Sequence, residues 1–364
     1  LGPIDENTKS DDIPILCVIQ VSFEGEISRK SVMKSISAGH QPFGDQIPWK
    51  FCEQFNDTVF PSLSGARIVR IATHPSATRL GYGTAAIEIL ARYFEGKITP
   101  FSEMDTEEVP EKSEVNIIEA AEKAYLLEET IKPRTGKELA PLLVPLSDRK
   151  PEKLHYIGVS FGLTLELLRF WRKHNFAPFY ISEIPSPVTG EHSCMILKPL
   201  SNDDIESTGS DQLGFFSSFY QDFRSRFTKL LARSFRSMDY KLAMSILDPK
   251  IEFNESQAAS SSPEEFPNPI SRKLLPSAML QLEAYVNNRV DYHLTGFFVT
   301  DLACAYFWKM VPVTLSYTQA SVLLCFGLQG KDISCIEKEM KELDRQQILS
   351  MYMKMMKKFY KYLS

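Results

Sequence analysis

The segment 67–96 constrains the fold of this chain more than any other. A β-branched run over 67–73 predicts a strand, and apolar residues at helical spacing over 84–94 predict a helix that ends at Gly96. Between them lies a loop that ends in Gly-Tyr-Gly at 81–83. A strand–loop–helix unit of this kind gathers backbone N–H groups and the positive end of a helix dipole at one point. The segment therefore predicts a phosphate-binding turn formed by the backbone.

Two classes of phosphate-bearing ligand are candidates for this loop. Gly81 and Gly83 match the dinucleotide-binding fingerprint, but in that motif the first glycine directly follows the strand, whereas residues 73–80 intervene here. The other candidate is the pyrophosphate loop of GNAT acetyltransferases, Arg/Gln-x-x-Gly-x-Gly/Ala. Residues 78–83 fit that spacing, with Thr78 where Arg or Gln is usual. A glycine-containing turn without a ligand is the third interpretation.

A second segment favours the acetyltransferase. Residues 167–176 read LLRFWRKHNF and predict an amphipathic helix, followed by a strand over 177–184. GNAT enzymes close their cofactor cleft with a similar aromatic-rich helix and a strand. Each segment alone is compatible with ordinary packing, but two of them in this order indicate the GNAT arrangement.

Further motifs extend the resemblance along almost the whole chain. The chain resembles the RNA cytidine acetyltransferase family, and its eukaryotic members more than the bacterial one. The motifs are IPWKFCEQF (47–55), SGARIVRIATHP (64–75), GYGTAAIEIL (81–90), YIGVSFGLT (156–164), LLRFWRKHNF (167–176), TGEHSCMILK (189–198), YQDFRSRFTKLL (220–231), NNRVDYHL (287–294) and ASVLLCFGLQGK (320–331).

The resemblance implies an α/β fold: a GNAT-type mixed sheet flanked by helices, followed by a mainly α-helical C-terminal domain. We expect an N-terminally incomplete acetyltransferase domain at 1–200, with an acidic insertion at about 97–150 that contains one helix near 114–130. A polar linker is expected at 201–212, and a helical domain of the RNA-binding type at 213–364.

The resemblance also implies acetyl-CoA as the cofactor. The expected contacts are Ile71, Ala72, Thr73, Thr78, Arg79, Leu80, Gly81, Tyr82, Gly83, Thr84 and Lys173. At Gly83 we expect no room for a side chain. Lys173 replaces the usual Arg and keeps its charge but not its bidentate fork. Asn175 replaces the usual Gly of the same turn, and Asn tolerates a left-handed backbone.

The acceptor implied by the resemblance is the exocyclic N4 of cytidine, whose acetylation needs one proton removed. His74 directly follows the cofactor strand and is the first candidate for the catalytic base. A histidine that caps the loop before Pro75 is the alternative interpretation. Further base candidates are Glu24, Glu26, Glu53 and His192, and the family's base is also expected upstream of Leu1.

The charge distribution bears on RNA binding. The net charge of −5 excludes a uniformly cationic RNA-binding protein. Cations gather between 224 and 241, where a basic helix face is predicted to follow an RNA backbone through Arg224, Arg226, Lys229 and Arg233. An amphipathic helix with a solvated basic face is equally compatible. The lysines over 354–361 predict a solvated face or the start of a basic tail.

Cysteine usage and motifs exclude several site types. The six cysteines are scattered without a C-x-x-C pair, which predicts buried free thiols and no metal site. No apolar run is long enough for a membrane span, so no membrane partner is expected. The chain lacks a Walker-type phosphate loop, and the resemblance implies ATP binding by an upstream module that this chain does not contain.

Three functions remain open from the sequence. The first is the C-terminal part of an enzyme that acetylates N4 of cytidine in small-subunit rRNA and tRNA. For this function the resemblance implies rRNA and tRNA as partners, adaptor proteins, a homodimer, and a nuclear and nucleolar location. The second is a GNAT acetyltransferase that acts on a protein or small amine. The third is a non-catalytic RNA-binding fragment.

Overall fold

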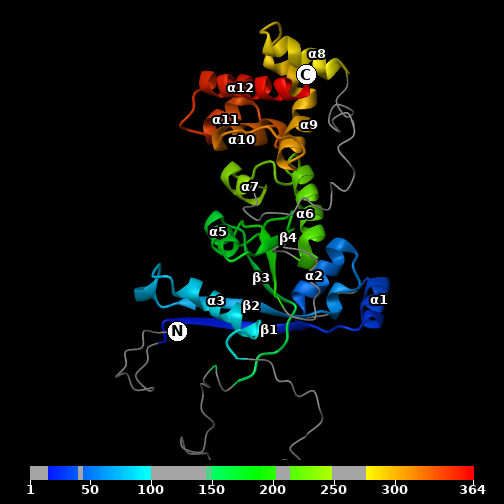
Figure 1. Ribbon diagram of the computed structural model, residues 1–364, viewed down its shortest axis with the longest axis vertical. Coiled ribbons are helices and arrows are strands. Elements are labelled where there is room, and N and C mark those ends of the chain that lie inside the picture. Colours follow the sequence, from blue (N-terminus) through cyan, green and yellow to red (C-terminus); the bar gives the residue numbers. More distant parts are fainter. Residues whose placement is uncertain (1–14, 40–43, 100–145, 147–148, 202–213, 248–275) are drawn as a thin grey trace, which may run out of the picture.

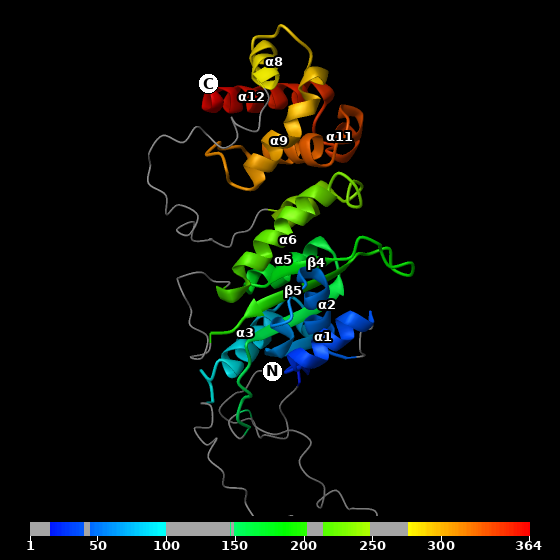
Figure 2. The same ribbon diagram turned by 90° about the vertical axis from the view of Figure 1, so that its right-hand side faces the viewer.

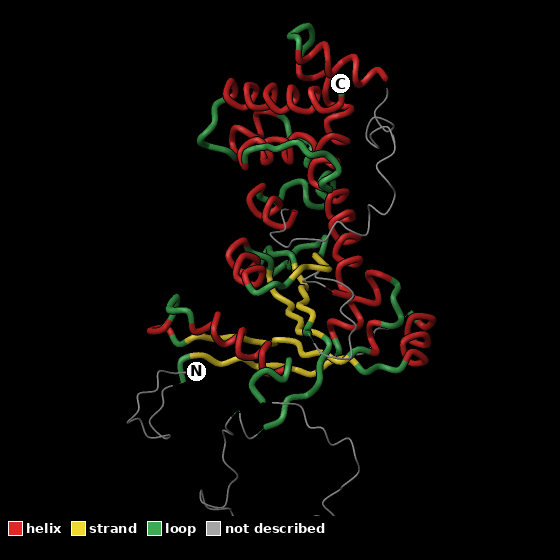
Figure 3. The backbone as a smooth tube through the Cα atoms, in the orientation of Figure 1, coloured by secondary structure: helices red, strands yellow, loops and turns green. Residues whose placement is uncertain are grey.

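The computed structural model describes residues 15–39, 44–99, 146, 149–201, 214–247 and 276–364. The helix expected near 114–130 and nearly all of the 201–212 linker lie outside the described residues. The strands and the helices that flank them form one half of the molecule, and the later helices form the other (Figures 1 and 3).

A five-stranded mixed sheet forms the first half, in the order β1-β2-β3-β5-β4. Its strands are β1 (Cys17–Gly25), β2 (Ser64–Thr73), β3 (Tyr156–Gly162), β4 (Ala177–Ile181) and β5 (Ser193–Pro199). Only β2 and β3 pair in parallel, and the other neighbours are antiparallel. The expected GNAT-type mixed sheet is confirmed, although β4 ends three residues earlier than the sequence predicted.

The two central strands pair over a short distance and then diverge. The β2–β3 ladder runs from Gly65↔Tyr156 to Ile68↔Val159 and stops. Beyond it, β2 continues to Thr73 beside β1, and β3 continues to Gly162 beside β5. Figure 1 shows β3 turning away from β2. We call this opening the β2–β3 wedge. The part of β2 that borders the wedge begins after Ile68, where its pairing with β3 ends.

The paired end of the wedge depends on a glycine. A Cβ atom at Gly65 would lie 2.2 Å from the ring of Tyr156, the residue paired with it across the ladder. Tyr156 is completely buried, and burial raises the pKa of its phenol well above the ordinary value. Gly65 therefore allows this large ring to fill the core where the two strands meet.

Four α-helices accompany the sheet among the residues that the structure describes. They are α1 (Arg29–Ala38), α2 (Gln46–Phe55), α3 (Tyr82–Phe94) and α5 (Leu165–Lys173). The chain leaves α3 as expected, because Gly96 has a φ of +67° and its N–H donates to Tyr93 O. Asn175 has a φ of +64°, so the turn after α5 adopts the left-handed backbone that the sequence predicted.

The described residues of the second half form helices joined by turns and loops, without a strand among them (Figure 2). It contains α6 (Ser217–Leu230), α7 (Tyr240–Leu247), α8 (Pro276–Val286), α9 (Gly296–Phe307), α10 (Tyr317–Leu323), α11 (Ile333–Glu339) and α12 (Arg345–Leu363), with a π-helical turn at Leu324–Leu328. The Ser/Pro-rich segment before α8 lies outside the described residues. Helix α12 begins with a capping box between Asp344 and Gln347.

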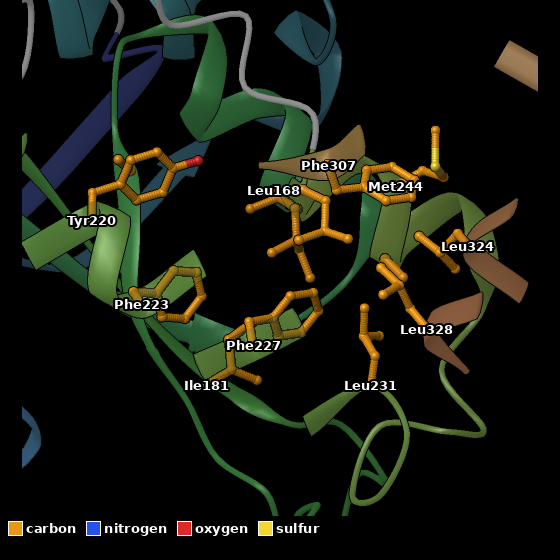
Figure 4. Close-up of a cluster of buried hydrophobic side chains, with 14 of the residues drawn as sticks. Leu168, Ile181, Tyr220, Phe223, Phe227, Leu231, Met244, Phe307, Leu324 and Leu328 are labelled. Atoms are coloured by element: carbon orange, nitrogen blue, oxygen red, sulfur yellow. The ribbon is translucent and has the colours of Figure 1, made fainter. Parts of the chain in front are cut away.

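One hydrophobic core extends through both halves. Helix α6 connects them, because Phe223 and Phe227 lie among Ile181 of β4 and Leu168 of α5, while Leu231 lies beside Leu328 (Figure 4). Arg172 of α5 also donates to the carbonyl oxygen of Ser245 in α7. The helical half is therefore packed on the sheet as part of the same core.

Among the described residues, no helix combines the length and apolar character that a bilayer crossing requires. All six cysteines are free thiols. Four are buried as predicted, but Cys335 is exposed and Cys304 is half-buried, which corrects the expectation for these two.

Candidate functional site

The open end of the wedge meets the start of α3 and one face of α5. A Cβ atom placed on Gly83 would lie 3.6 Å from Thr73 Oγ1, 3.7 Å from Phe170 Cζ and 3.9 Å from Ile71 Cδ1. Residues of β2 and α5 therefore gather around Gly83 of α3, within van der Waals reach of a side chain placed there. The structure brings together the strand, the glycine loop and the aromatic helix that the sequence singled out separately.

The first turn of α3 offers uncommitted amide donors. The N-cap position is Gly81, which has a φ of +92° and no side chain to cap the helix. The first turn also contains no acidic residue that would offset the positive end of the helix dipole. An anion such as a diphosphate fits this donor set, because the amides and the dipole both favour negative charge.

The loop between β2 and α3 contains a 3₁₀ turn and is largely exposed. Pro75–Ala77 form a 3₁₀ turn, after which Thr78 and Leu80 are exposed and Arg79 has a left-handed φ of +65°. The predicted contacts Tyr82 and Thr84 are half-buried in the first turn of α3. The exposure of this loop and its glycine N-cap leave the loop backbone accessible to a ligand.

On β2, the predicted contacts Ile71, Ala72 and Thr73 all lie beyond the last pair of the β2–β3 ladder. Ala72 is exposed, and the other two are half-buried. These residues therefore line the open part of the wedge, where amide donors from a strand can reach a ligand's carbonyl oxygen.

Helix α5 presents different faces to the core and to the loop. Trp171 is buried against Phe161 and Phe176, while Phe170 points toward Gly83. Lys173 is exposed and lies three residues after Phe170, hence on the same face of the helix. Phe170 directly precedes the buried Trp171 and therefore lies on a different side of the helix, and this position is the signal in the sequence that could have identified it as the residue facing the loop.

The expectation that Gly83 leaves no room for a side chain is corrected. The nearest atoms to a Cβ at this position lie at ordinary van der Waals distances of 3.6–3.9 Å. Alanine would fit without displacing a neighbour. Any requirement for glycine at position 83 therefore comes from a ligand and not from the folded chain.

His74 acts as the cap of the 3₁₀ turn. Its Nδ1 accepts a hydrogen bond from the backbone N–H of Ser76 at 3.3 Å and lies 2.7 Å from Ser76 Oγ. A neutral imidazole that accepts at Nδ1 carries its proton on Nε2, so neither nitrogen presents a lone pair to a substrate. This geometry supports the loop-capping interpretation of His74 and not the catalytic one.

We expect His74→Asn to preserve the turn and His74→Ala to weaken it, because Asn accepts the same backbone hydrogen bond and Ala cannot. The alanine variant should lose about 1 kcal/mol of stability and bind acetyl-CoA less tightly. Chemical denaturation and calorimetry measure the two quantities. If His74 were instead the base, Asn and Ala would reduce turnover equally while both retained cofactor affinity.

The carboxylate candidates for the base have structural partners. Glu24 is buried, accepts from Arg67 Nε and from the N–H of Ile47 at 3.0 Å, and so fastens α2 to the sheet. Glu53 pairs with Lys50 at 2.5 Å. Both carboxylate oxygens of Glu24 are therefore occupied by structural partners, which favours a structural role for Glu24 over a catalytic one.

The other two candidates lie in turns. Glu26 is exposed with a φ of +56°. His192 Nδ1 lies 2.7 Å from Ser182 O and must donate to it, because a carbonyl oxygen only accepts. In the neutral form of the ring Nε2 then carries the lone pair, and the ring packs edge-on against Phe235 of the helical half. His192 lies at the C-terminal end of β3, opposite Leu163.

The predicted basic helix face is only partly present. Arg224 is buried and donates to Leu247 O at 2.9 Å and Phe307 O at 2.7 Å. Arg226 donates to Gln54 O at 2.8 Å and lies over the ring of Phe55. The prediction that Arg224 contacts RNA is wrong, because its guanidinium group donates to two carbonyl groups inside the helical half. Arg226 mainly connects α6 to α2.

The remaining predicted RNA contacts are exposed. Lys229 lies in the last turn of α6, and Arg233 follows the end of that helix at Leu230. They therefore do not form one continuous helical stripe with the two arginines. Among the described residues, no group of three or more His, Cys, Asp or Glu side chains is arranged to hold a metal ion.

Comparison with known proteins identifies both halves. Residues 1–201 match the family model described as GNAT acetyltransferase 2, and residues 215–364 match one described as "Possible tRNA binding domain". RNA cytidine acetyltransferase 1 of Arabidopsis thaliana is 60% identical over 366 residues, covering 100% of this chain and 35% of the relative.

More distant relatives carry the same name. RNA cytidine acetyltransferase of Homo sapiens is 40% identical over 95% of this chain and 32% of its own length, and that of Saccharomyces cerevisiae is 39% identical over 100% and 34%. The chain spans about a third of the length of these curated relatives. The resemblance to RNA cytidine acetyltransferases is thus confirmed, and the chain belongs to the GNAT acetyltransferase 2 family.

Proposed function

We propose that this chain is the acetyl-transferring and RNA-binding portion of an RNA cytidine acetyltransferase. The observation that carries the proposal is the meeting of β2, the glycine N-terminus of α3 and Phe170 of α5 around Gly83, at the open end of the wedge. This arrangement suits a ligand with a diphosphate at one end and an acyl group at the other. The relatives are named RNA cytidine acetyltransferases, which supports cytidine in RNA as the acceptor of the acetyl group.

Acetyl-CoA would supply an acetyl group activated as a thioester. The amides of the first turn of α3 would hold its diphosphate, and Lys173 would add positive charge from the facing helix. The amides of Ile71 to Thr73 would orient the acetyl carbonyl in the wedge and stabilise negative charge on its oxygen. In net terms, the cytidine N4 exchanges one N–H bond for an N–acetyl bond, and the sulfur leaves as a thiol that carries that proton.

The finer assignments rest on the resemblance to the eukaryotic members. We propose small-subunit rRNA and tRNA as acceptors, adaptor proteins and a homodimer as assemblies, a nuclear and nucleolar site of action, and ATP use by a separate module. For the RNA-contacting residues named from the sequence, Lys229 and Arg233 remain proposals because both side chains are exposed.

The test is an acetylation assay with the full-length protein. RNA incubated with the protein, acetyl-CoA and ATP is expected to contain N4-acetylcytidine, detected by nucleoside mass spectrometry. Acetyl-lysine in an added protein without any N4-acetylcytidine would favour the protein-acetylating alternative. Calorimetry that detects no acetyl-CoA binding would leave only the non-catalytic alternative.

A further inference from the structure

The last helix carries an unusual charge for this protein. Helix α12 contains five basic residues, Arg345, Lys354, Lys357, Lys358 and Lys361, and no carboxylate. The chain as a whole has a net charge of −5. All five basic side chains are exposed. Helix α12 is therefore a basic element of a molecule whose net charge is negative.

Three of these lysines share one side of the helix. Lys354, Lys357 and Lys361 follow the spacing i, i+3, i+7, which places them on one face. We call them the α12 lysine face. Their Cα atoms extend over about 10 Å of helix axis, and the opposite side of α12 is buried through Tyr352, Met355, Met356 and Phe359.

The fourth lysine, Lys358, forms hydrogen bonds within the helical half. Lys358 donates to Thr314 O at 2.7 Å and to Gln319 Oε1 at 3.3 Å, which fastens α12 to the start of α10. Among the described residues, none of the three ammonium groups of the α12 lysine face forms an ion pair or a hydrogen bond. The face is thus fixed in position by its helix while its charges remain available.

Stabilisation of the helix does not account for these charges. A cation near a helix C-terminus interacts favourably with the dipole, but this effect is confined to the last turn. Lys361 lies in that turn, whereas Lys354 and Lys357 precede it. A row of like charges is also mutually repulsive. A polyanionic partner would offset that repulsion.

We propose that the α12 lysine face binds the phosphodiester backbone of RNA. The inference rests on the proposed function, and it adds a second surface to the exposed Lys229 and Arg233, because Arg224 and Arg226 form internal contacts. Successive ammonium groups along one helix face match successive phosphates in charge. Contacts of this kind position an RNA without reading its sequence.

The experiment measures the salt dependence of RNA binding by the full-length protein, with an RNA hairpin as the probe. The triple variant Lys354→Gln, Lys357→Gln, Lys361→Gln is expected to bind more weakly. Its plot of log affinity against log salt should be shallower by about 2, because each lost phosphate contact removes roughly 0.7–0.9 from the slope. The triple Lys→Arg variant keeps the charge and should retain the original slope.

The matched control replaces exposed lysines elsewhere in the helical half, Lys309, Lys338 and Lys341, with Gln. Its slope should equal that of the unmodified protein. A triple α12 variant with an unchanged slope, an unmodified protein without salt-dependent RNA binding, or equal displacement of the RNA by polyglutamate would each overturn the proposal.

Acetyl-CoA affinity, measured on the same variants, separates the two proposals. It should not change in any of them, because α12 lies in the helical half, away from the wedge (Figure 1). An unmodified protein that binds RNA through α12 but fails to bind acetyl-CoA would contradict the proposed function alone. Retained acetyl-CoA binding with an unaltered salt slope would contradict only the α12 lysine face.

Discussion

Replacing Gly83 with glutamate is expected to abolish the binding of acetyl-CoA. The β-carbon of the new side chain fits the fold, since a Cβ at this position has no neighbour closer than 3.6 Å. Its carboxylate, however, would stand at the N-terminus of α3, where the diphosphate is proposed to lie. Two like charges about 4 Å apart near a protein surface repel by roughly 4 kcal/mol, which corresponds to a loss of about a thousandfold in affinity.

Calorimetric titration with acetyl-CoA measures this loss, and two variants at the same position serve as controls. Gly83→Ala should bind nearly as well as the unmodified protein, because the methyl group meets only van der Waals contacts. Gly83→Gln has the size of glutamate without its charge and should fall between the two. Equal affinity for the glutamate and glutamine variants would show that charge at this point does not affect binding. It would contradict the proposed position of the diphosphate at the N-terminus of α3.

Replacing Arg224 with methionine is expected to destabilise the protein strongly. Methionine restores much of the apolar volume but leaves the carbonyl oxygens of Leu247 and Phe307 without their donor. Each buried polar group that loses its partner costs about 1–3 kcal/mol. The free energy of unfolding should therefore fall by roughly 2–5 kcal/mol.

Urea denaturation followed by circular dichroism measures the change, with Arg233→Met as the matched control. Arg233 is exposed beyond the end of α6, so its replacement should alter stability by no more than about 0.5 kcal/mol. The Arg224 variant should also lose the docking of α9 on α6, because Phe307 is the last residue of α9. Similar stability for both variants would show that the buried guanidinium contributes nothing to the helical half.

Features set by neighbouring residues could be predicted from the sequence. The strand, loop and helix of 67–96 follow from β-branched residues, glycines and helical spacing that lie within one short segment. The left-handed turns at Gly96 and Asn175 have the same local origin. The family resemblance implied a mixed sheet, but the order of the strands and the short parallel pairing of β2 with β3 came from the structure. Pairing between distant strands leaves no signature in either strand alone.

Features set by distant partners could not be predicted. Whether Arg224 faces water or the core depends on carbonyl groups of α7 and α9, which lie 23 and 83 residues further along the chain. The sequence of α6 has the same charge pattern whether Arg224 faces water or the core, so it cannot distinguish the two. His74 is similar, because its sequence position beside the cofactor strand is compatible with catalysis, and only the hydrogen bond from Ser76 assigns its proton.

The close approach of Gly65 to Tyr156 has a consequence for inherited variation. Any larger residue at position 65 would collide with a ring that has no free space, and β2 would have to move away from β3 at the end where they are paired. The mouth of the wedge would then widen or tilt, although every residue proposed to contact the cofactor remained unaltered. A substitution there would present as a defect in coenzyme affinity whose cause lies in the core.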